Sequence, residues 1–138
     1  MEQLQIAFLL GTLYLIFTIY VMLYNSLGRF DKSYVVLSII SVFILMVGLA
    51  VGHCSIINPL HYIIVFLVIC SIFLSNVFLV MISFFITFSV KISWIVYGYC
   101  VLNKGPNRLG FDKEMDIGMN MLLLIQIAKI VYHYYKKK

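Results

Sequence analysis

The chain has 138 residues, of which 64% are hydrophobic and only 11% are charged. A soluble domain carries roughly 25% charged residues, so there is too little polar surface here to cover a water-soluble globule. The net charge of +5 does not indicate a nucleic-acid partner, because the basic residues flank the apolar runs and the C-terminus. That placement is typical of membrane anchoring and orientation. We therefore expect a single membrane domain over residues 1–138, whose partners are membrane lipids and other membrane chains or itself, with no nucleic acid.

The first apolar run, residues 6–24, predicts a retained membrane helix, because its start is acidic and lacks the basic region of a secretory signal. A second helix is expected over residues 34–52. Between them, residues 24–33 are expected to form a connection in which Asn25, Gly28 and Asp31 make turns.

The central stretch, residues 60–102, holds 43 almost wholly apolar residues and one charge, Lys91. A membrane helix needs about 20 such residues. The stretch is either two spans, 60–81 and 83–102, joined by a tight hairpin near Ser83, or one long tilted helix ending near Lys91. Asn58 and Pro59 precede it, and a proline at a first helical position predicts a helix that starts near Pro59.

These two alternatives give five or four membrane helices. One helix over residues 60–102 would be about 64 Å long, twice the hydrocarbon core of about 30 Å, so length favours five. Five spans place five basic residues on the C-terminal side against three on the other side, which puts the C-terminus in the cytosol or matrix. Four spans divide the basic residues six against three, so charge counting does not separate the alternatives. The expected fold class is an all-α, polytopic membrane bundle with five transmembrane helices.

The last run, residues 117–135, follows a polar segment whose acids gather at the start of the helix. Gln126, Lys129 and His133 are spaced three and four apart, so they fall on one helical face. We expect a membrane span with one polar stripe; the alternative is an interfacial helix. Tyrosines near the segment ends predict an aromatic belt at the membrane surfaces; they are Tyr24, Tyr34, Tyr62, Tyr97, Tyr99, Tyr132, Tyr134 and Tyr135.

Lys91 is the most informative candidate for a polar site inside the membrane. In the five-span arrangement it lies near the middle of the bilayer, where a lysine costs about 2.5–3.5 kcal/mol. No Asp or Glu occurs within an apolar run, so we expect another subunit, a lipid phosphate, or carbonyl and serine groups as its partner. The functional interpretation is an ion path or a subunit contact. The structural interpretation is a lysine that snorkels from a shorter or kinked span.

The histidines and cysteines do not indicate a catalytic or metal site. His53, His61 and His133 are expected to be wet, interfacial histidines. Five spans bring Cys54 and Cys100 near one face, where they can form a disulfide. The cysteine and histidine spacing matches no metal site, and no catalytic or cofactor motif occurs, so we expect neither an enzyme nor a bound cofactor.

Residues 48–68 and 93–101 carry a family resemblance. A short loop with Cys54 leads to Pro59 and Tyr62, and a later span contains Trp94 and Gly98. In these features the chain resembles the transmembrane protein 272-like family of small animal proteins. The resemblance implies separate spans on either side of Ser83, a Cys54 loop on the outer side, and a plasma or secretory membrane. It implies no biochemical activity.

The leading functional expectation is a non-catalytic accessory or structural subunit of a membrane complex or homo-oligomer, packed through small and polar positions such as Gly48, Ser71, Ser75, Asn76, Ser83 and Gly98. A channel or transporter component is the alternative, with Lys91 and the Gln126, Lys129 and His133 stripe lining a polar path. An accessory subunit of an organelle respiratory chain or ATP synthase, in the mitochondrial inner membrane, is a further alternative.

Overall fold

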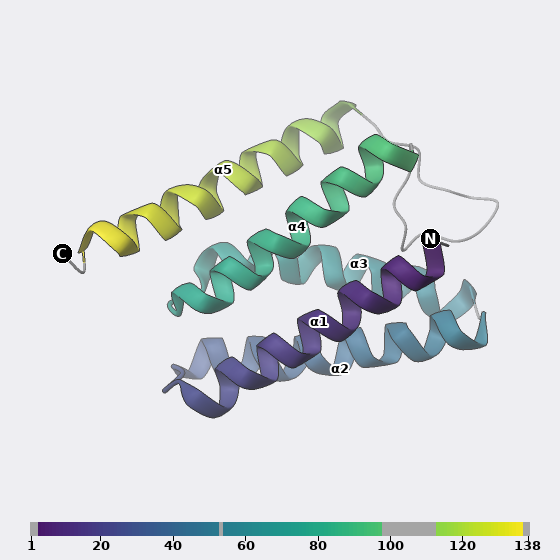
Figure 1. Ribbon diagram of the computed structural model, residues 1–138, viewed down its shortest axis with the longest axis horizontal. Helices are drawn as coiled ribbons and strands as arrows, with labels where there is room; N and C mark the ends of the chain where they lie inside the picture. The colour runs from purple at the N-terminus through teal and green to yellow at the C-terminus, as the bar shows by residue number, and fades with distance from the viewer. Residues whose placement is uncertain (1–2, 53, 98–112, 137–138) are drawn as a thin grey trace.

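The computed structural model describes residues 3–52, 54–97 and 113–136, with side chains over 5–52, 59–96 and 116–136. It contains, in order, α1 (Gln3–Tyr24), α2 (Arg29–Val51), α3 (Cys54–Cys70), the short 3₁₀ helix η1 (Ser71–Phe73), α4 (Val77–Tyr97) and α5 (Lys113–Lys136). Successive helices alternate in direction, so the α1–α2 and α3–α4 connections lie at the same end as the C-terminus (Figure 1). We name this the C-terminal end and the opposite end the N-terminal end. The expected all-helical bundle is confirmed, with no strand in the described ranges.

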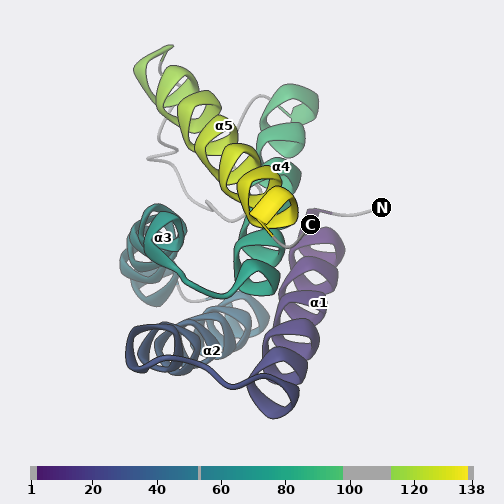
Figure 2. The same ribbon diagram turned by 90° about the vertical axis from the view of Figure 1, so that its left-hand side faces the viewer.

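The helices form two pairs that α1 bridges. α2 packs against α3, α4 packs against α5, and α1 contacts both α2 and α4. The end-on view shows α3 beside α2, with α5 resting on α4 at the opposite side of the bundle (Figure 2). η1 contacts α3, α4 and α5, so this short turn joins both pairs.

The first connection is shorter than predicted. α2 begins at Arg29, so only residues 25–28 link it to α1, and Asp31 lies in the first turn of the helix. Gly28 is extended (φ −63°, ψ 167°), and an acid in a first turn is stabilised by the partial positive charge of the helix N-terminus. α2 ends as predicted, because Gly52 adopts the left-handed conformation (φ 76°) that favours glycine and its N–H donates to the Gly48 carbonyl at 2.9 Å.

The central stretch breaks at residues 71–76, and the predicted hairpin at Ser83 is wrong. α3 ends at Cys70, η1 follows, and α4 begins at Val77, so Ser83 lies well inside α4. The alternative of one long helix is wrong as well, because the two halves run in opposite directions (Figure 1). The spans predicted as 60–81 and 83–102 are therefore shifted toward the N-terminus.

Polar side chains explain why the chain turns at this point. The Asn76 side-chain oxygen accepts hydrogen bonds from the N–H groups of Phe78 at 3.0 Å and Leu79 at 3.3 Å. This is an N-cap, which satisfies donors that a helix start leaves without partners. The carboxylate of Asp31 accepts from the N–H groups of Ser75 at 3.0 Å and Asn76 at 2.9 Å. Four backbone donors of the turn thus have side-chain acceptors.

The predicted helix start near Pro59 is also wrong. α3 begins at Cys54 and contains Pro59 at its sixth position. A proline there removes one backbone hydrogen bond within the first two turns. With 17 residues α3 is about 26 Å long, and the three residues of η1 add about 6 Å.

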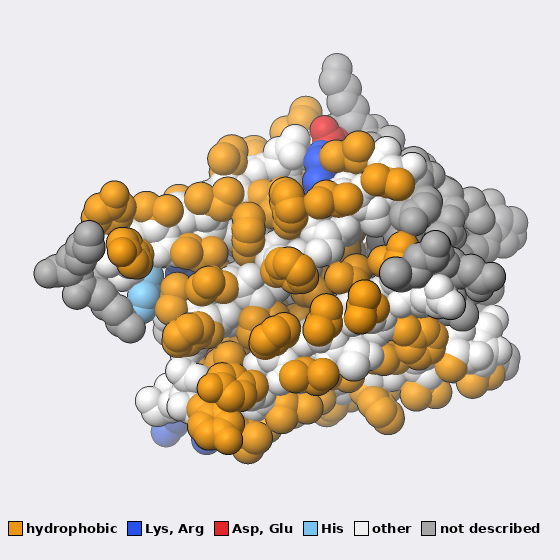
Figure 3. Space-filling view, in the orientation of Figure 1, with side chains coloured by type: hydrophobic (Ala, Val, Ile, Leu, Met, Phe, Trp, Pro, Cys, Tyr) orange, Lys and Arg blue, Asp and Glu red, His pale blue; other side chains and the backbone are white. Residues whose placement is uncertain are grey.

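The outside of the bundle is apolar. α1, α2, α4 and α5 are each long and apolar enough to cross a membrane, whereas the apolar part of α3 and η1, Pro59–Phe73, is shorter. Large hydrophobic side chains are exposed on every one of these helices, and they cover most of the face seen in Figure 3. This surface is consistent with a multi-pass membrane protein.

Candidate functional site

The polar stripe of α5 faces the interior of the bundle. Gln126 is fully buried (0% exposed), and Lys129 and His133 are half-buried. Nε2 of Gln126 donates hydrogen bonds to Oγ of Ser71 at 2.9 Å and to Oγ of Ser83 at 3.4 Å. The stripe therefore ties α5 to η1 and α4.

Asp31 and Lys129 hold the α3–α4 turn from two sides. Nζ of Lys129 donates to the Ile72 carbonyl at 2.6 Å, while the Asp31 carboxylate accepts from the N–H groups of Ser75 and Asn76. The opposite charges of Asp31 and Lys129 also attract each other across the turn. We call this set of five residues the turn clamp. It joins α2 and α5, which lie far apart in the sequence, through the η1 turn.

Hydroxyl groups continue the polar contacts toward α1. Tyr34 lies within hydrogen-bonding range of Ser83 and of Tyr14, and Tyr14 lies within range of Ser38. All four side chains are buried. Because Ser83 also accepts from Gln126, side-chain contacts link α1, α2, α4 and α5 through one buried polar cluster. Buried polar groups of this kind stabilise one arrangement of helices when their partners are present.

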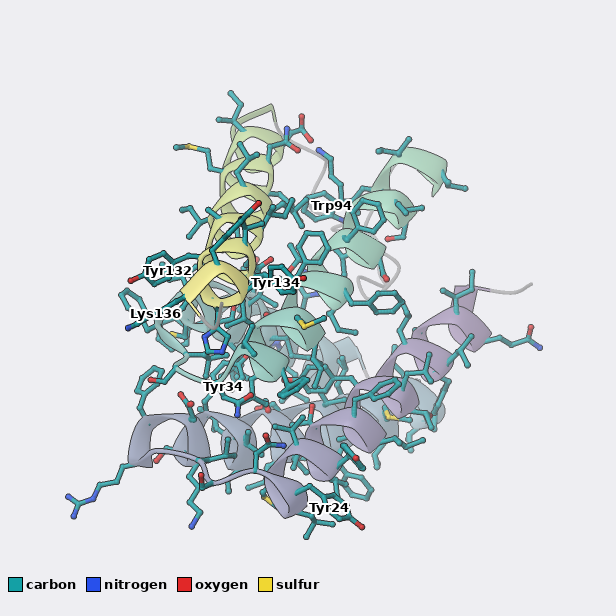
Figure 4. The ribbon with its side chains drawn as sticks, turned by 60° about the vertical axis from the view of Figure 1, so that its left-hand side comes forward. Tyr24, Tyr34, Trp94, Tyr132, Tyr134 and Lys136 are labelled. Atoms are coloured by element: carbon teal, nitrogen blue, oxygen red, sulfur yellow. The ribbon has the colours of Figure 1, made fainter. Side chains whose placement is uncertain are left out.

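Tyr34 is a correction to the predicted aromatic belt. It is 6% exposed, whereas Tyr24 at the same end of the bundle is 73% exposed. Figure 4 shows Tyr34 directed from α2 into the bundle and Tyr24 on the outside. Ser83 and Tyr14 give the Tyr34 hydroxyl partners in the interior, which removes the need for a place at the membrane surface.

Lys91 has an acidic partner, contrary to the prediction. Its Nζ forms an ion pair with Oδ1 of Asp116 in the first turns of α5, and the two side chains are 13% and 34% exposed. Since α4 starts at Val77, Lys91 lies six residues from the end of the helix at Tyr97 and not at its middle. The antiparallel arrangement brings that end of α4 beside the start of α5 (Figure 1).

The residues of the predicted polar path are not brought together. Asp116, the partner of Lys91, and Lys129 are thirteen residues apart on α5, which corresponds to about 20 Å along the helix. Lys91 thus belongs to the N-terminal end, and the turn clamp with Gln126 belongs to the C-terminal end.

A cavity of about 70 Å³ lies between α1, α2, α3 and α4. Its lining is mostly aliphatic and includes no charged side chain. Tyr14, Tyr34, Ser38 and Ser83 of the buried polar cluster line it toward the C-terminal end, and Ser93 lines it toward the N-terminal end. Neither Lys91 nor the α5 stripe is part of this lining.

The histidines and cysteines stay separate within the described part of the chain. His61 is 8% exposed on α3, so the expected wet environment is wrong for this histidine. His53 and the proposed Cys54–Cys100 disulfide lie outside the side chains that the structure describes, and Cys70 is a free, half-buried thiol. Among the described residues no three His, Cys, Asp or Glu side chains gather in a way that could hold a metal ion.

Asp31 is the important residue that sequence reasoning assigned to a loop. It is 2% exposed and bonded to a turn 44 residues away. One signal was available: Asp31 is the only acid between Glu2 and Asp112. A single acid next to long apolar runs is expected to have a specific partner, because burying a charge without one is costly.

Together, the apolar exterior, the membrane-length helices and the buried polar cluster define a small α-helical bundle of the multi-pass membrane type. Comparison of the chain with family models, with curated proteins and with solved structures gives no match. The resemblance to the transmembrane protein 272-like family therefore stays a prediction that rests on the residues quoted for it.

Proposed function

We propose that the protein is a non-catalytic multi-pass membrane protein that acts as an accessory or structural subunit of a membrane complex or homo-oligomer. The observation that carries this proposal is the surface of α5. Only 11% of its most apolar stretch is buried within the chain, against 44% for α2. Gln126, Lys129 and His133 lie on the inward side of α5. The outward side carries the exposed Asn120 and offers aliphatic groups such as Leu124 and Ile125 to a neighbouring chain.

The contact surface differs from the one expected from the small residues. Gly48, Ser71 and Ser83 are buried within the chain, and Gly98 lies outside the described residues. These three buried positions are not available to a partner, whereas Ser75 is exposed and Asn76 half-buried at the α3–α4 turn. The proposed contact is made by the larger side chains of α5.

We propose further that all five helices cross the membrane. α3 and η1 together extend about 32 Å, close to the hydrocarbon thickness of about 30 Å. The alternating directions would then place Arg29, Lys32 and the terminal lysines on one side, the side with more basic residues. By the positive-inside rule this side faces the cytosol or matrix.

The contacts of the polar residues favour a subunit over a channel. Lys91 is paired with Asp116, Lys129 with a backbone carbonyl, and Gln126 with two serines. A polar path needs groups that are free to face water, whereas each of these three side chains has a partner within the chain. A channel would require Lys91→Met to alter conductance in proteoliposomes, and we expect that variant to behave as the wild type.

A photocrosslinking experiment in native membranes tests the subunit proposal. A photoreactive phenylalanine analogue is placed at Ile125 on α5 or, as a matched control, at Val36 on α2; the two are 46% and 49% exposed. We expect the Ile125 position to give one discrete protein adduct, either a second copy of the chain or one partner that co-purifies in stoichiometric amount. The Val36 position should give lipid adducts. Lipid adducts at both positions, with a monomer in mild detergent by light scattering, would contradict the proposal.

A further inference from the structure

The cavity between α1, α2, α3 and α4 has two chemically different ends. Toward the C-terminal end it is bordered by the hydroxyls of Tyr14, Tyr34, Ser38 and Ser83. Toward the N-terminal end its walls are mainly aliphatic, formed by residues such as Ala7, Leu10, Leu45, Leu49 and Val90. Ser93 also lines this end, and its hydroxyl donates to the Val90 carbonyl at 2.7 Å. A ligand that fits both ends carries one polar group on a hydrocarbon body.

The shape of the cavity suits a chain. Its lining runs along α2 from Tyr34 to Leu49, about 22 Å. A volume of about 70 Å³ holds roughly five groups the size of a water molecule, so the cavity takes the polar group and the first few carbons of a ligand and not a whole long chain. This small volume, spread over that length, describes a narrow slot that takes a linear hydrocarbon chain better than a fused ring system. The aliphatic part of the cavity disfavours water as the occupant, because a buried water needs two to four polar partners.

The route from the lipid phase that we infer lies at the junction of α3 and α4. These two helices share little direct packing, and the cavity is lined there by Ile64 and Val68 of α3 and by Ile86 and Val90 of α4. All four side chains are half-buried. A chain entering between them passes only apolar groups.

The polar end of the cavity favours a ligand whose polar group is an uncharged hydrogen-bond donor. No charged side chain lines the cavity, and burying a carboxylate or phosphate without a counter-charge costs several kcal/mol. A hydroxyl offers one donor and two acceptor lone pairs. The Ser38 hydroxyl donates to the Val35 carbonyl at 2.9 Å and also lies within hydrogen-bonding range of Tyr14, so the capacity that remains to its oxygen is one acceptor lone pair. An alcohol O–H supplies the donor that such an oxygen can accept.

We propose that this cavity is a binding site for the head of a neutral long-chain alcohol. Its hydroxyl meets the Tyr14, Tyr34 and Ser38 group, its first carbons lie between α1, α2, α3 and α4, and the rest of the chain extends between α3 and α4 into the lipid. The site does not depend on the proposed subunit role, because none of its lining residues belongs to α5.

Photolabelling of the purified full chain in phosphatidylcholine nanodiscs tests the site. The probe is a hexadecanol analogue with a diazirine in its chain. We expect saturable labelling of α1–α4 peptides, competed by unlabelled hexadecanol and at least tenfold less well by palmitate at pH 8. Non-saturable labelling, labelling confined to α5, or equal competition by palmitate would each overturn the proposal.

One variant of α2 and one matched control on the same helix test whether the alcohol binds in the cavity. Val42 lines the cavity and is 9% exposed, whereas Val47 on the same helix is 48% exposed and outside the lining. Val42→Phe should lower labelling at least fivefold, and Val47→Phe should stay within twofold of the wild type. Equal labelling of the two would exclude the cavity.

Ser38→Ala removes the proposed hydroxyl partner without filling the cavity. We expect about fivefold weaker binding of hexadecanol, the usual effect of one hydrogen bond, with a normal helical melting curve. This variant keeps the test decisive if Val42→Phe fails to fold. Unchanged binding by Ser38→Ala would refute the assignment of the polar end.

Discussion

Removing the Asp31 carboxylate should destabilise the bundle more than any other single change in a polar group. The side chain is 2% exposed and accepts hydrogen bonds from the N–H groups of Ser75 and Asn76. A hydrogen bond to a charged group contributes about 1.5–3 kcal/mol, so two bonds give about 3–6 kcal/mol. Ser75 is exposed, and water can replace part of the interaction there. We therefore expect Asp31→Ala to lower the free energy of unfolding by about 3 kcal/mol, and Asp31→Asn by about half of that, because one acceptor oxygen remains.

The measurement is unfolding in mixed micelles by titration with a denaturing detergent, followed by helical circular dichroism. Lys32→Ala is the matched control, since Lys32 is the exposed neighbour in the same helical turn and should change stability by less than about 0.5 kcal/mol. Hydrogen exchange gives a local readout: amides of residues 74–79 should exchange faster in Asp31→Asn and not in Lys32→Ala. Equal stability of Asp31→Ala and Lys32→Ala, with unchanged exchange in the turn, would refute the turn clamp.

Further substitutions test three other contacts: those of Gln126, the N-cap of α4 at Asn76, and the ion pair of Lys91 with Asp116. Gln126→Leu should stay within about 1 kcal/mol of the wild type, because it also removes a buried Oε1 that has no hydrogen-bond partner among the described residues. Gln126→Ala should lower the free energy of unfolding by about 2–3 kcal/mol because it leaves a cavity. Similar losses of stability in the Leu and Ala variants would contradict this explanation. Asn76→Ala should cost about 1 kcal/mol as a lost N-cap, with Asn76→Asp retaining most of the stability; a helix that melts identically in all three proteins would show that the cap is unimportant. Asp116→Asn should cost about 1 kcal/mol by leaving Lys91 without its acid, and adding Lys91→Met should recover most of the loss; no recovery in the double variant would argue against the ion pair.

The apolar runs predicted the order of the five α-helices within the described residues, because burial in lipid or protein leaves a strong signal in composition. That all five cross the membrane stays a proposal. The position of the central break was not visible in the same way. The apolar stretch contains several polar residues, among them Ser75, Asn76 and Ser83. Only a tertiary contact shows which of them mark the turn: Asp31, 45 residues before Asn76, accepts a hydrogen bond from the Asn76 N–H. Because the sequence alone does not reveal this contact, it predicts a break near the middle of the stretch.

For the candidate site, too, the sequence predicts which residues share a helical face but not which residues of other helices they contact. Helical periodicity placed Gln126, Lys129 and His133 on one face, and they do face inward. Their partners on η1 and α4 depend on how α5 docks, which periodicity does not contain. The sequence predicts that the helix of Lys91 begins at residue 83, six residues later than it does, and therefore places Lys91 at mid-membrane. In that register Lys91 lies too far from the end of its helix to reach Asp116, its partner in the structure.

The turn clamp has a consequence for the order in which the chain matures. Asp31 is synthesised early and Lys129 almost last, yet both bind the turn at residues 71–76 that lies between them in the sequence. A chain released from the ribosome as far as α4 holds the acid on this turn without the counter-charge of α5. The last helix to be made thus completes a contact begun by the second, so a chain cut short before α5 keeps the Asp31 carboxylate on the turn without the opposite charge of Lys129.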